Sequence, residues 1–262
     1  MSIDLEAEYN NRARVPEHPG IIKSWAEQSA AYRKAKPPRE IAYGAGEREK
    51  FDLFDAGAGP AVMFVHGGYW QALDKSFFSH MARGLNAKGV TVAVPSYDLC
   101  PDVRIGDIIG QISAACAALA RETAAPVVVS GHSAGGHLAA CMLAERDDVA
   151  SAYAISGLFE LEPLMATSLN GALRLDVDEA RRLSPRYWKA PQGKMLDAVV
   201  GGAESGEFLR QSAEIARAWG EAGAVTRYEE IEAANHFTAI APLADPGSPM
   251  CARLKAMIDA AV

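Results

Sequence analysis

Residues 126–145 constrain the fold of this chain more than any other segment. Residues 126–130 form a short, apolar, mostly β-branched run, which is typical of a strand buried on both faces of a sheet. Gly-His-Ser-Ala-Gly follows at residues 131–135, and apolar residues then recur at helical spacing. A strand, a glycine-flanked serine and a helix form the context in which a G-x-S-x-G match predicts a nucleophile. We therefore predict that Ser133 lies on a strained turn at a helix N-terminus, which favours developing negative charge.

Length and charge narrow the class of protein. At 262 residues the chain is long enough for one α/β domain with a sizeable core. Its formal charge of −7 and the lack of a basic cluster argue against nucleic acid or a membrane surface as a partner. No apolar run approaches the roughly 18 residues of a membrane span. The acidic N-terminus lacks a signal peptide, and the four cysteines lack C-x-x-C spacing. We expect a soluble, cytoplasmic enzyme with buried thiols; the oligomeric state stays open.

Strand-like runs alternate with helical patterns along most of the chain. The expected strands cover residues 41–43, 50–54, 61–65, 90–94, 126–130, 150–155, 195–200 and 224–231. The expected helices cover residues 75–88, 105–121, 207–221 and 248–261, in addition to the one after Ser133. This alternation predicts an α/β fold with a mostly parallel central sheet and helices on both faces.

Two segments fall outside the alternation. Residues 1–38 are polar and helix-like and end at two prolines, so we expect an N-terminal helical extension that packs over the main domain, residues 39–262. Residues 157–190 hold prolines and a charged helix, and we interpret them as a small cap-like insertion that covers the site.

A serine nucleophile needs a base, and His236 is the candidate. Ligands bind beyond the carboxyl ends of parallel strands, and His66, Ser133, Glu204 and His236 each follow an expected strand. His236 comes last, in the chain order nucleophile, acid, base. His132 flanks Ser133, as does His137, and both are expected to project away from its reactive face.

The carboxylate that orients this base is expected to be Glu204, which follows the strand at 195–200. Asp197 inside that strand and Glu207 at the start of the next helix remain alternatives. Asp245 comes after the histidine and would break the chain order.

An oxyanion needs N–H donors aimed at it. Ala134, which follows the candidate nucleophile, is expected to supply one. Gly67 and Gly68, which let the backbone turn after the strand at 61–65, are expected to supply the other. His66 is interpreted as a structural hydrogen-bonding residue. No His, Asp or Glu spacing resembles a metal-ligand set, so we expect neither a metal nor another cofactor.

Several segments together resemble a known family. They are residues 66–71 (HGGYWQ), 131–140 (GHSAGGHLAA), 156–163 (SGLFELEP), 183–185 (LSP), 200–201 (VG), 204–212 (ESGEFLRQS) and 236–237 (HF). Here the chain resembles the α/β-hydrolase superfamily, and within it the serine-dependent kynurenine formamidases (arylformamidases). The likeness spans most of the chain from about residue 40. Two positions depart from the family pattern: Glu204 stands where an aspartate is usual, and Asn235 where an acid is frequent.

The resemblance implies an activity. Relatives of this kind hydrolyse the formyl amide of N-formyl-kynurenine through an acyl-enzyme, which suggests a small-molecule acyl or formyl substrate. An aryl group would need aromatic walls, for which the candidates are Tyr69, Trp70, Phe159, Trp188 and Phe237. Tyr69 and Trp70 are equally compatible with plain packing. A carboxylesterase or thioesterase with the same triad is the alternative, and a hydrolase-fold protein that only binds its ligand is a third hypothesis.

Overall fold

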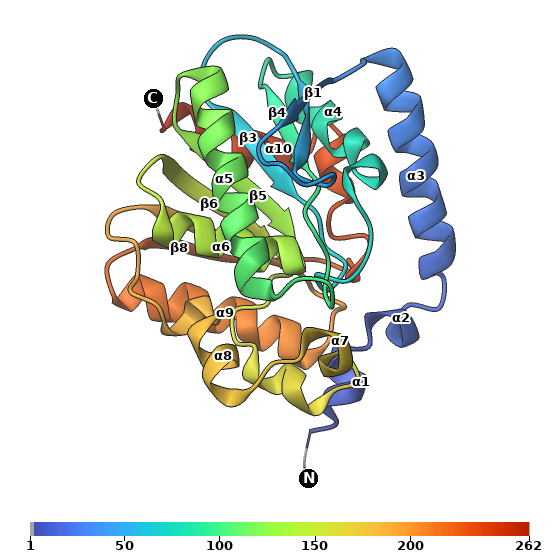
Figure 1. Cartoon of the computed structure of the whole chain (residues 1–262), viewed down its shortest axis with the longest axis vertical. Helices are drawn as coiled ribbons and strands as arrows, with labels where there is room; N and C mark the ends of the chain where they lie inside the picture. Colours follow the sequence, from blue (N-terminus) through green and yellow to red (C-terminus); the bar gives the residue numbers. More distant parts are fainter. Residues whose placement is uncertain (1–2, 262) are drawn as a thin grey trace.

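A mixed sheet forms the centre of the molecule (Figure 1). The computed structural model describes residues 3–261, and within them eight strands pair in the order β1-β2-β4-β3-β5-β6-β7-β8. The pairs β1–β2 and β2–β4 are antiparallel, and the other neighbouring pairs are parallel. The strands are β1 (Arg39–Ala42), β2 (Lys50–Phe54), β3 (Ala61–Val65), β4 (Val92–Pro95), β5 (Val127–His132), β6 (Val149–Ile155), β7 (Met195–Gly201) and β8 (Val225–Ile231). The predicted α/β class with a mostly parallel sheet is confirmed.

Helices cover both faces of the sheet. They are α1 (Leu5–Tyr9), α2 (Asn11–Arg14), α3 (His18–Ala35), α4 (Arg83–Asn86), α5 (Ile105–Thr123), α6 (Ala134–Glu145), α7 (Asn170–Leu173), α8 (Val177–Arg182), α9 (Gly206–Glu221) and α10 (Pro249–Asp259). The 3-10 turns are η1 (Lys75–Phe77), η2 (Ser79–Ala82), η3 (Glu162–Ala166), η4 (Pro185–Tyr187) and η5 (Ala241–Ala244). Helices α5, α6 and α9 share a core with Met63 of β3, and α3, α4 and α10 share a second core with Phe64. Adjacent side chains of one strand therefore enter opposite layers, as a doubly covered sheet requires.

The register of the central strands brings their carboxyl ends to one edge. In the β3–β5 pair Val65 lies opposite Gly131, and in the β5–β6 pair His132 lies opposite Ile155. The loop that follows β3 and the turn that follows β5 consequently emerge side by side. This edge is where ligands bind in open α/β sheets.

The helix predicted at residues 75–88 is wrong as a single element. The segment winds instead as η1, η2 and α4. It is confined between α3 and the sheet: the His80 ring bonds Ser29 of α3 across 2.8 Å, while Phe78 packs against Trp25 and Phe64. Because side chains on both sides of this segment are buried, tertiary packing overrides its regular helical pattern.

The N-terminal segment lies against the insertion at residues 157–190. Figure 1 shows α1 beside α7 at one end of the molecule. The Glu6 carboxylate accepts hydrogen bonds from Ser168 N, at 2.7 Å, and from Ser168 Oγ, at 2.8 Å. The Tyr9 hydroxyl donates to Glu207 Oε2 of α9, at 2.8 Å. These contacts join segments that are about 160 to 200 residues apart in the sequence.

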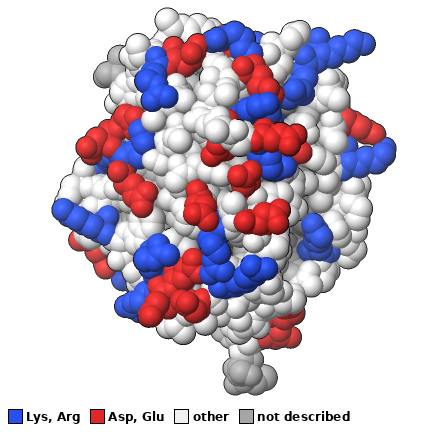
Figure 2. All heavy atoms as spheres, viewed as in Figure 1, with Lys and Arg blue, Asp and Glu red and all other residues white. Residues whose placement is uncertain are grey.

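The surface carries charges of both signs. Figure 2 shows acidic and basic side chains interspersed over the visible face, rather than one broad basic area. Within residues 3–261, no helix combines the length and the apolarity that crossing a bilayer would require. Cys100, Cys116, Cys141 and Cys251 are all buried and unpaired with one another.

Candidate active site

Ser133 occupies the turn between β5 and α6. The strand continues to His132, two residues further than predicted, and the helix begins at Ala134. Ser133 has φ 57° and ψ −119°, a sparsely populated conformation that costs about 1–3 kcal/mol. Its N–H donates to the carbonyl of Ile155 across 2.8 Å, which holds the turn against the neighbouring strand. The strained strand-to-helix turn that the sequence predicts is therefore present.

The glycines around Ser133 allow three backbones to meet. A Cβ atom at Gly131 would lie 2.0 Å from the carbonyl oxygen of Gly135, and one at Gly135 would lie 2.0 Å from that of Val65. Both distances are far inside van der Waals contact, so no side chain fits at either position. The two glycines of the G-x-S-x-G pattern therefore allow β3, β5 and α6 to pack closely, in addition to allowing the turn itself.

We predict that Gly135→Ala destabilises the fold by about 3 kcal/mol, because the added methyl group collides with backbone atoms that cannot move aside. Gly110→Ala is the matched control: Gly110 is exposed in α5 with nothing within 4 Å of an added Cβ atom, and it should gain up to about 1 kcal/mol. Urea unfolding of the two variants measures both changes. Equal stabilities would contradict the packing argument.

Glu204 and His236 form a buried pair beyond the ends of β7 and β8. Glu204 Oε2 lies 2.6 Å from His236 Nδ1, and both side chains are at most 7% exposed. The other carboxylate oxygen, Oε1, accepts from Gly201 N at 2.7 Å and from the Ser156 hydroxyl. A carboxylate against Nδ1 holds the proton on that nitrogen and leaves Nε2 free to accept one. A histidine held in this way is chemically able to accept a proton at Nε2.

The two alternative acids, Asp197 and Glu207, form ion pairs with arginines instead. Asp197 accepts two hydrogen bonds from Arg253, at 2.7 and 2.9 Å. Glu207 pairs with Arg210 at 2.7 Å and accepts from Tyr9. Within the described residues, neither carboxylate bonds a histidine.

His132 departs from the expectation. Its side chain does not project away from the site: the ring lies 4.7 Å from that of His236, and its Nε2 donates to the His236 carbonyl oxygen across 2.8 Å. Burial, and then the neighbouring His236, keep the pKa of His132 well below its ordinary value, so the ring is neutral. His137 does point away, donating to the Leu183 carbonyl at 2.8 Å and meeting Trp70 edge-on. The β5 strand places His132 toward the site because it extends further than predicted.

The loop after β3 passes directly over Ser133. A Cβ atom at Gly67 would lie 3.0 Å from Ser133 Cβ. Gly68, Tyr69 and Trp70 then take φ values of 110°, 50° and 57°, three successive residues in the left-handed region. Such a run is strained, and it persists only where its surroundings hold it.

The N-terminal segment holds this loop. The Tyr69 hydroxyl donates to the carbonyl of Tyr9 at 2.7 Å and accepts from Asn11 Nδ2 at 3.2 Å. The N–H groups of Gly67, Gly68 and Ala134 donate to no acceptor within residues 3–261. They are therefore available to a ligand oxygen near Ser133, with the Ala134 N–H at the positive end of α6.

His66 has a structural environment. Its Nδ1 donates to the Gly67 carbonyl at 2.7 Å, and its ring stacks on Tyr97 at 4.3 Å and on Phe78 at 5.6 Å. Burial lowers the pKa of His66 to about 4, which keeps the ring neutral at physiological pH.

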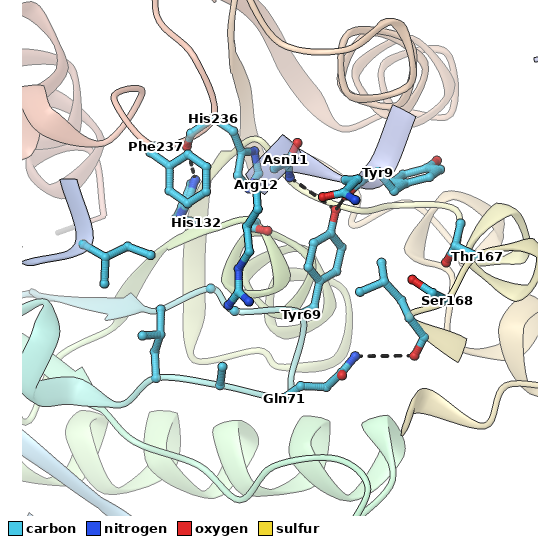
Figure 3. Close-up of a pocket in the computed structure, with 18 of the residues that line it drawn as sticks. Tyr9, Asn11, Arg12, Tyr69, Gln71, His132, Thr167, Ser168, His236 and Phe237 are labelled. Carbon is cyan, nitrogen blue, oxygen red and sulfur yellow. Dashed lines mark hydrogen bonds between the residues drawn. The ribbon is translucent and has the colours of Figure 1, made fainter. Parts of the chain in front are cut away.

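A cavity of about 420 Å³ opens onto these groups (Figure 3). Ser133, His132 and His236 line its floor, together with residues 67–69 of the loop after β3. Residues 9–12 of the N-terminal segment and residues 167–169 of the insertion form other parts of its wall. Among the described residues, Ser133 Oγ makes no hydrogen bond with His236, although both side chains face this cavity.

Two of the five aromatic residues proposed as walls for the substrate line the cavity. Tyr69 and Phe237 do so. Trp70 and Phe159 do not: each is 0% exposed and belongs to the core shared with α5 and α6, so those two predictions are wrong. Trp188 also lies outside the cavity. Large apolar side chains are stabilised most by complete removal from water, and Trp70 and Phe159 are completely buried in the core.

The N-terminal wall is the part of the site that sequence reasoning missed. Tyr9, Asn11 and Arg12 line the cavity, yet they match no motif. The available signal was weak: Tyr9 and Trp25 are aromatic residues in a polar stretch, and both are buried.

Comparison with known proteins defines the class of the molecule. A family model for the alpha/beta hydrolase fold matches residues 62–189. The kynurenine formamidase of Salmo salar is 31% identical over 78% of this chain and 76% of its own length. That of Danio rerio is 28% identical over 87% of this chain and 83% of its own length. The chain belongs to the α/β-hydrolase family and is a hydrolase enzyme.

Solved structures agree with this assignment. A crystal structure of a proposed thioesterase from Silicibacter sp. is 40% identical, with a TM-score of 0.86 over 96% of this chain and 98% of the other. An esterase from Pyrobaculum calidifontis is 17% identical with a TM-score of 0.72, which supports the fold alone. Within the family, this chain is thus similar in sequence to kynurenine formamidases over most of its length.

Proposed function

We propose that this chain is a serine hydrolase that cleaves a small aryl formamide through an acyl-enzyme. The observation that carries the proposal is the buried pair of Glu204 and His236, whose histidine lines the same cavity as Ser133. In this assignment Ser133 is the nucleophile, His236 the general base and then acid, and Glu204 the orienting carboxylate.

The chemistry follows from these positions. His236 Nε2 takes the proton of Ser133 Oγ as the oxygen attacks the formyl carbon, and the carbonyl oxygen becomes negative. The free N–H groups of Ala134 and of Gly67 or Gly68 donate to that oxyanion. His236 then protonates the departing amine, which leaves a formyl ester on Ser133. Attack by water, with its proton passing to His236, releases formate and restores the serine.

Two observations support a formamide as the substrate. The formamidases of two fish are 28–31% identical to this chain over most of its length. The cavity also presents aromatic walls, Tyr69 and Phe237 near Ser133 with Trp25 and Phe78 beyond them, which suit an aryl leaving group. The fully buried Trp70 and Phe159 take no part in this recognition.

A second candidate, a carboxylesterase or thioesterase with the same triad, rests on a different observation. The Silicibacter sp. structure, a proposed thioesterase, is 40% identical to this chain over 96% of its length. The triad chemistry is the same for formamide, ester and thioester, so pocket shape separates them. In either case the substrate is a small molecule, and we expect the enzyme to act in the cytoplasm without a cofactor.

Steady-state kinetics test the substrate. N-formyl-kynurenine, p-nitrophenyl acetate and acetyl-coenzyme A are compared by kcat/KM, with Ser133→Ala as the control. We expect the formamide to exceed both others by at least about tenfold, since a site built for one leaving group discriminates by more than about 1.4 kcal/mol. A thioester or ester preference with no formamide turnover would replace the formamide by the second candidate.

A further inference from the structure

We propose that Arg12 binds a carboxylate on the substrate, so that the cavity selects an anionic leaving group. This inference rests on the proposed hydrolase function of the same cavity. It goes further by naming a binding residue outside the triad and the chemical class that this residue recognises.

Arg12 enters the cavity from α2. Figure 3 shows its guanidinium group hanging between Phe237 and Tyr69, over the region that Ser133 and His236 line. Within residues 3–261 this guanidinium makes neither a hydrogen bond nor an ion pair with the protein, so its donors are free for a ligand. A planar guanidinium matches a carboxylate through two parallel hydrogen bonds.

The backbone that carries Arg12 is fixed on one side. Asn11 is 5% exposed and donates to the Tyr69 hydroxyl, and that hydroxyl also bonds the carbonyl of Tyr9. The backbone next to Arg12 is consequently tied to the same loop that presents Gly67 to Ser133.

Charge within the cavity favours a single negative group. The other fully charged residue of the lining is Glu6, whose two carboxylate oxygens accept from Ser168 N and Oγ. Glu6 keeps its charge but forms no ion pair with Arg12 within residues 3–261. A cavity lined by one guanidinium and one carboxylate suits a monoanionic carboxylate better than a dianionic phosphate, which would draw several cations. The formal charge of −7 on the whole chain makes this local cation the feature that favours an anion here.

The test compares two formamides of nearly equal shape, the anionic 3-(4-formamidophenyl)propanoate and the neutral 3-(4-formamidophenyl)propanamide. Arg12→Ala is expected to raise KM for the propanoate about tenfold with kcat unchanged, and to change KM for the propanamide less than about twofold. Arg12→Lys should recover part of the loss. Arg14→Ala is the matched control, because Arg14 lies on the same helix, outside the cavity lining, and near Glu8.

Equal changes for both substrates would overturn the proposal, as would no change for either, since a structural role is blind to substrate charge. A turnover-independent measurement separates this inference from the proposed function. Calorimetric titration of Ser133→Ala with 3-(4-aminophenyl)propanoate should give tighter binding than with the matching propanamide, and adding Arg12→Ala should abolish that difference. This binding result would support the carboxylate site even if only esters were hydrolysed. Tighter binding of phenyl phosphate than of the propanoate, lost with Arg12, would overturn the carboxylate assignment.

Discussion

Ser133→Ala is expected to lower kcat by on the order of a million-fold, because it removes the nucleophilic oxygen while the rest of the site stays in place. The side chain is 2% exposed, and serine and alanine bear the same strain at φ 57°, so the fold should be retained. Rapid mixing with p-nitrophenyl acetate measures the effect directly. The wild-type enzyme should release a burst of p-nitrophenolate as the acyl-enzyme forms, and the variant should show neither burst nor turnover.

Ser130→Ala is the matched control for that experiment. Ser130 lies on β5 three residues before Ser133, is fully buried, and its hydroxyl has no hydrogen-bond partner within the described residues. Its loss should leave the burst unchanged and stability equal or higher. A Ser133→Ala protein that folds, by circular dichroism, and still turns over substrate would remove Ser133 from the mechanism.

His236→Ala is expected to lower kcat by nearly as much, on the order of 10⁴–10⁶-fold. Without the imidazole, no group accepts the serine proton, and the Glu204 carboxylate loses the 2.6 Å partner it holds in a buried position. Added imidazole should restore part of the activity by occupying the vacated space, an effect that a merely structural histidine would not produce. Failure of imidazole to rescue, together with a loss below about tenfold, would contradict the role of general base.

The acid is tested in the same series. Glu204→Ala should cost less than His236→Ala, on the order of 10³–10⁴-fold, because triad members contribute unequally. Asp197→Asn serves as the comparison: Asp197 is equally buried but faces Arg253, so turnover per folded molecule should stay near the wild-type value. Full activity in Glu204→Ala would move the acid elsewhere.

Local sequence was informative wherever burial is continuous along the chain. The run at 61–65 coincides with β3, and the apolar run that leads to Ser133 belongs to β5. Both strands are covered on both faces, so every residue in them is buried and the apolar pattern is unbroken. The chain order of Ser133, Glu204 and His236 placed each residue just past a strand. Parallel strands bring such positions to one edge, so a one-dimensional pattern predicted that these residues meet.

Local sequence was uninformative where burial depends on a distant partner. The prediction for residues 75–88 failed because α3 and the sheet enclose that segment on both sides. Trp70 and Phe159 were predicted to line the pocket because they are close in sequence to the site motifs, but their side chains are buried in the core. His132 enters the site because β5 runs two residues beyond its apolar run.

Patterns a few residues long were thus enough to predict the mostly parallel sheet, the strained turn at Ser133 and the candidate residues that follow its strands. What encloses the site depends instead on contacts between distant segments. The Tyr9–Tyr69 contact spans about 60 residues of sequence and the Glu6–Ser168 contact about 160, and no periodicity within either segment specifies its partner. A cavity wall forms where surfaces from distant parts of the chain pack together, and a local pattern does not encode that packing. Arg12 lies in the same cavity as Ser133 because the N-terminal segment packs against the loop after β3.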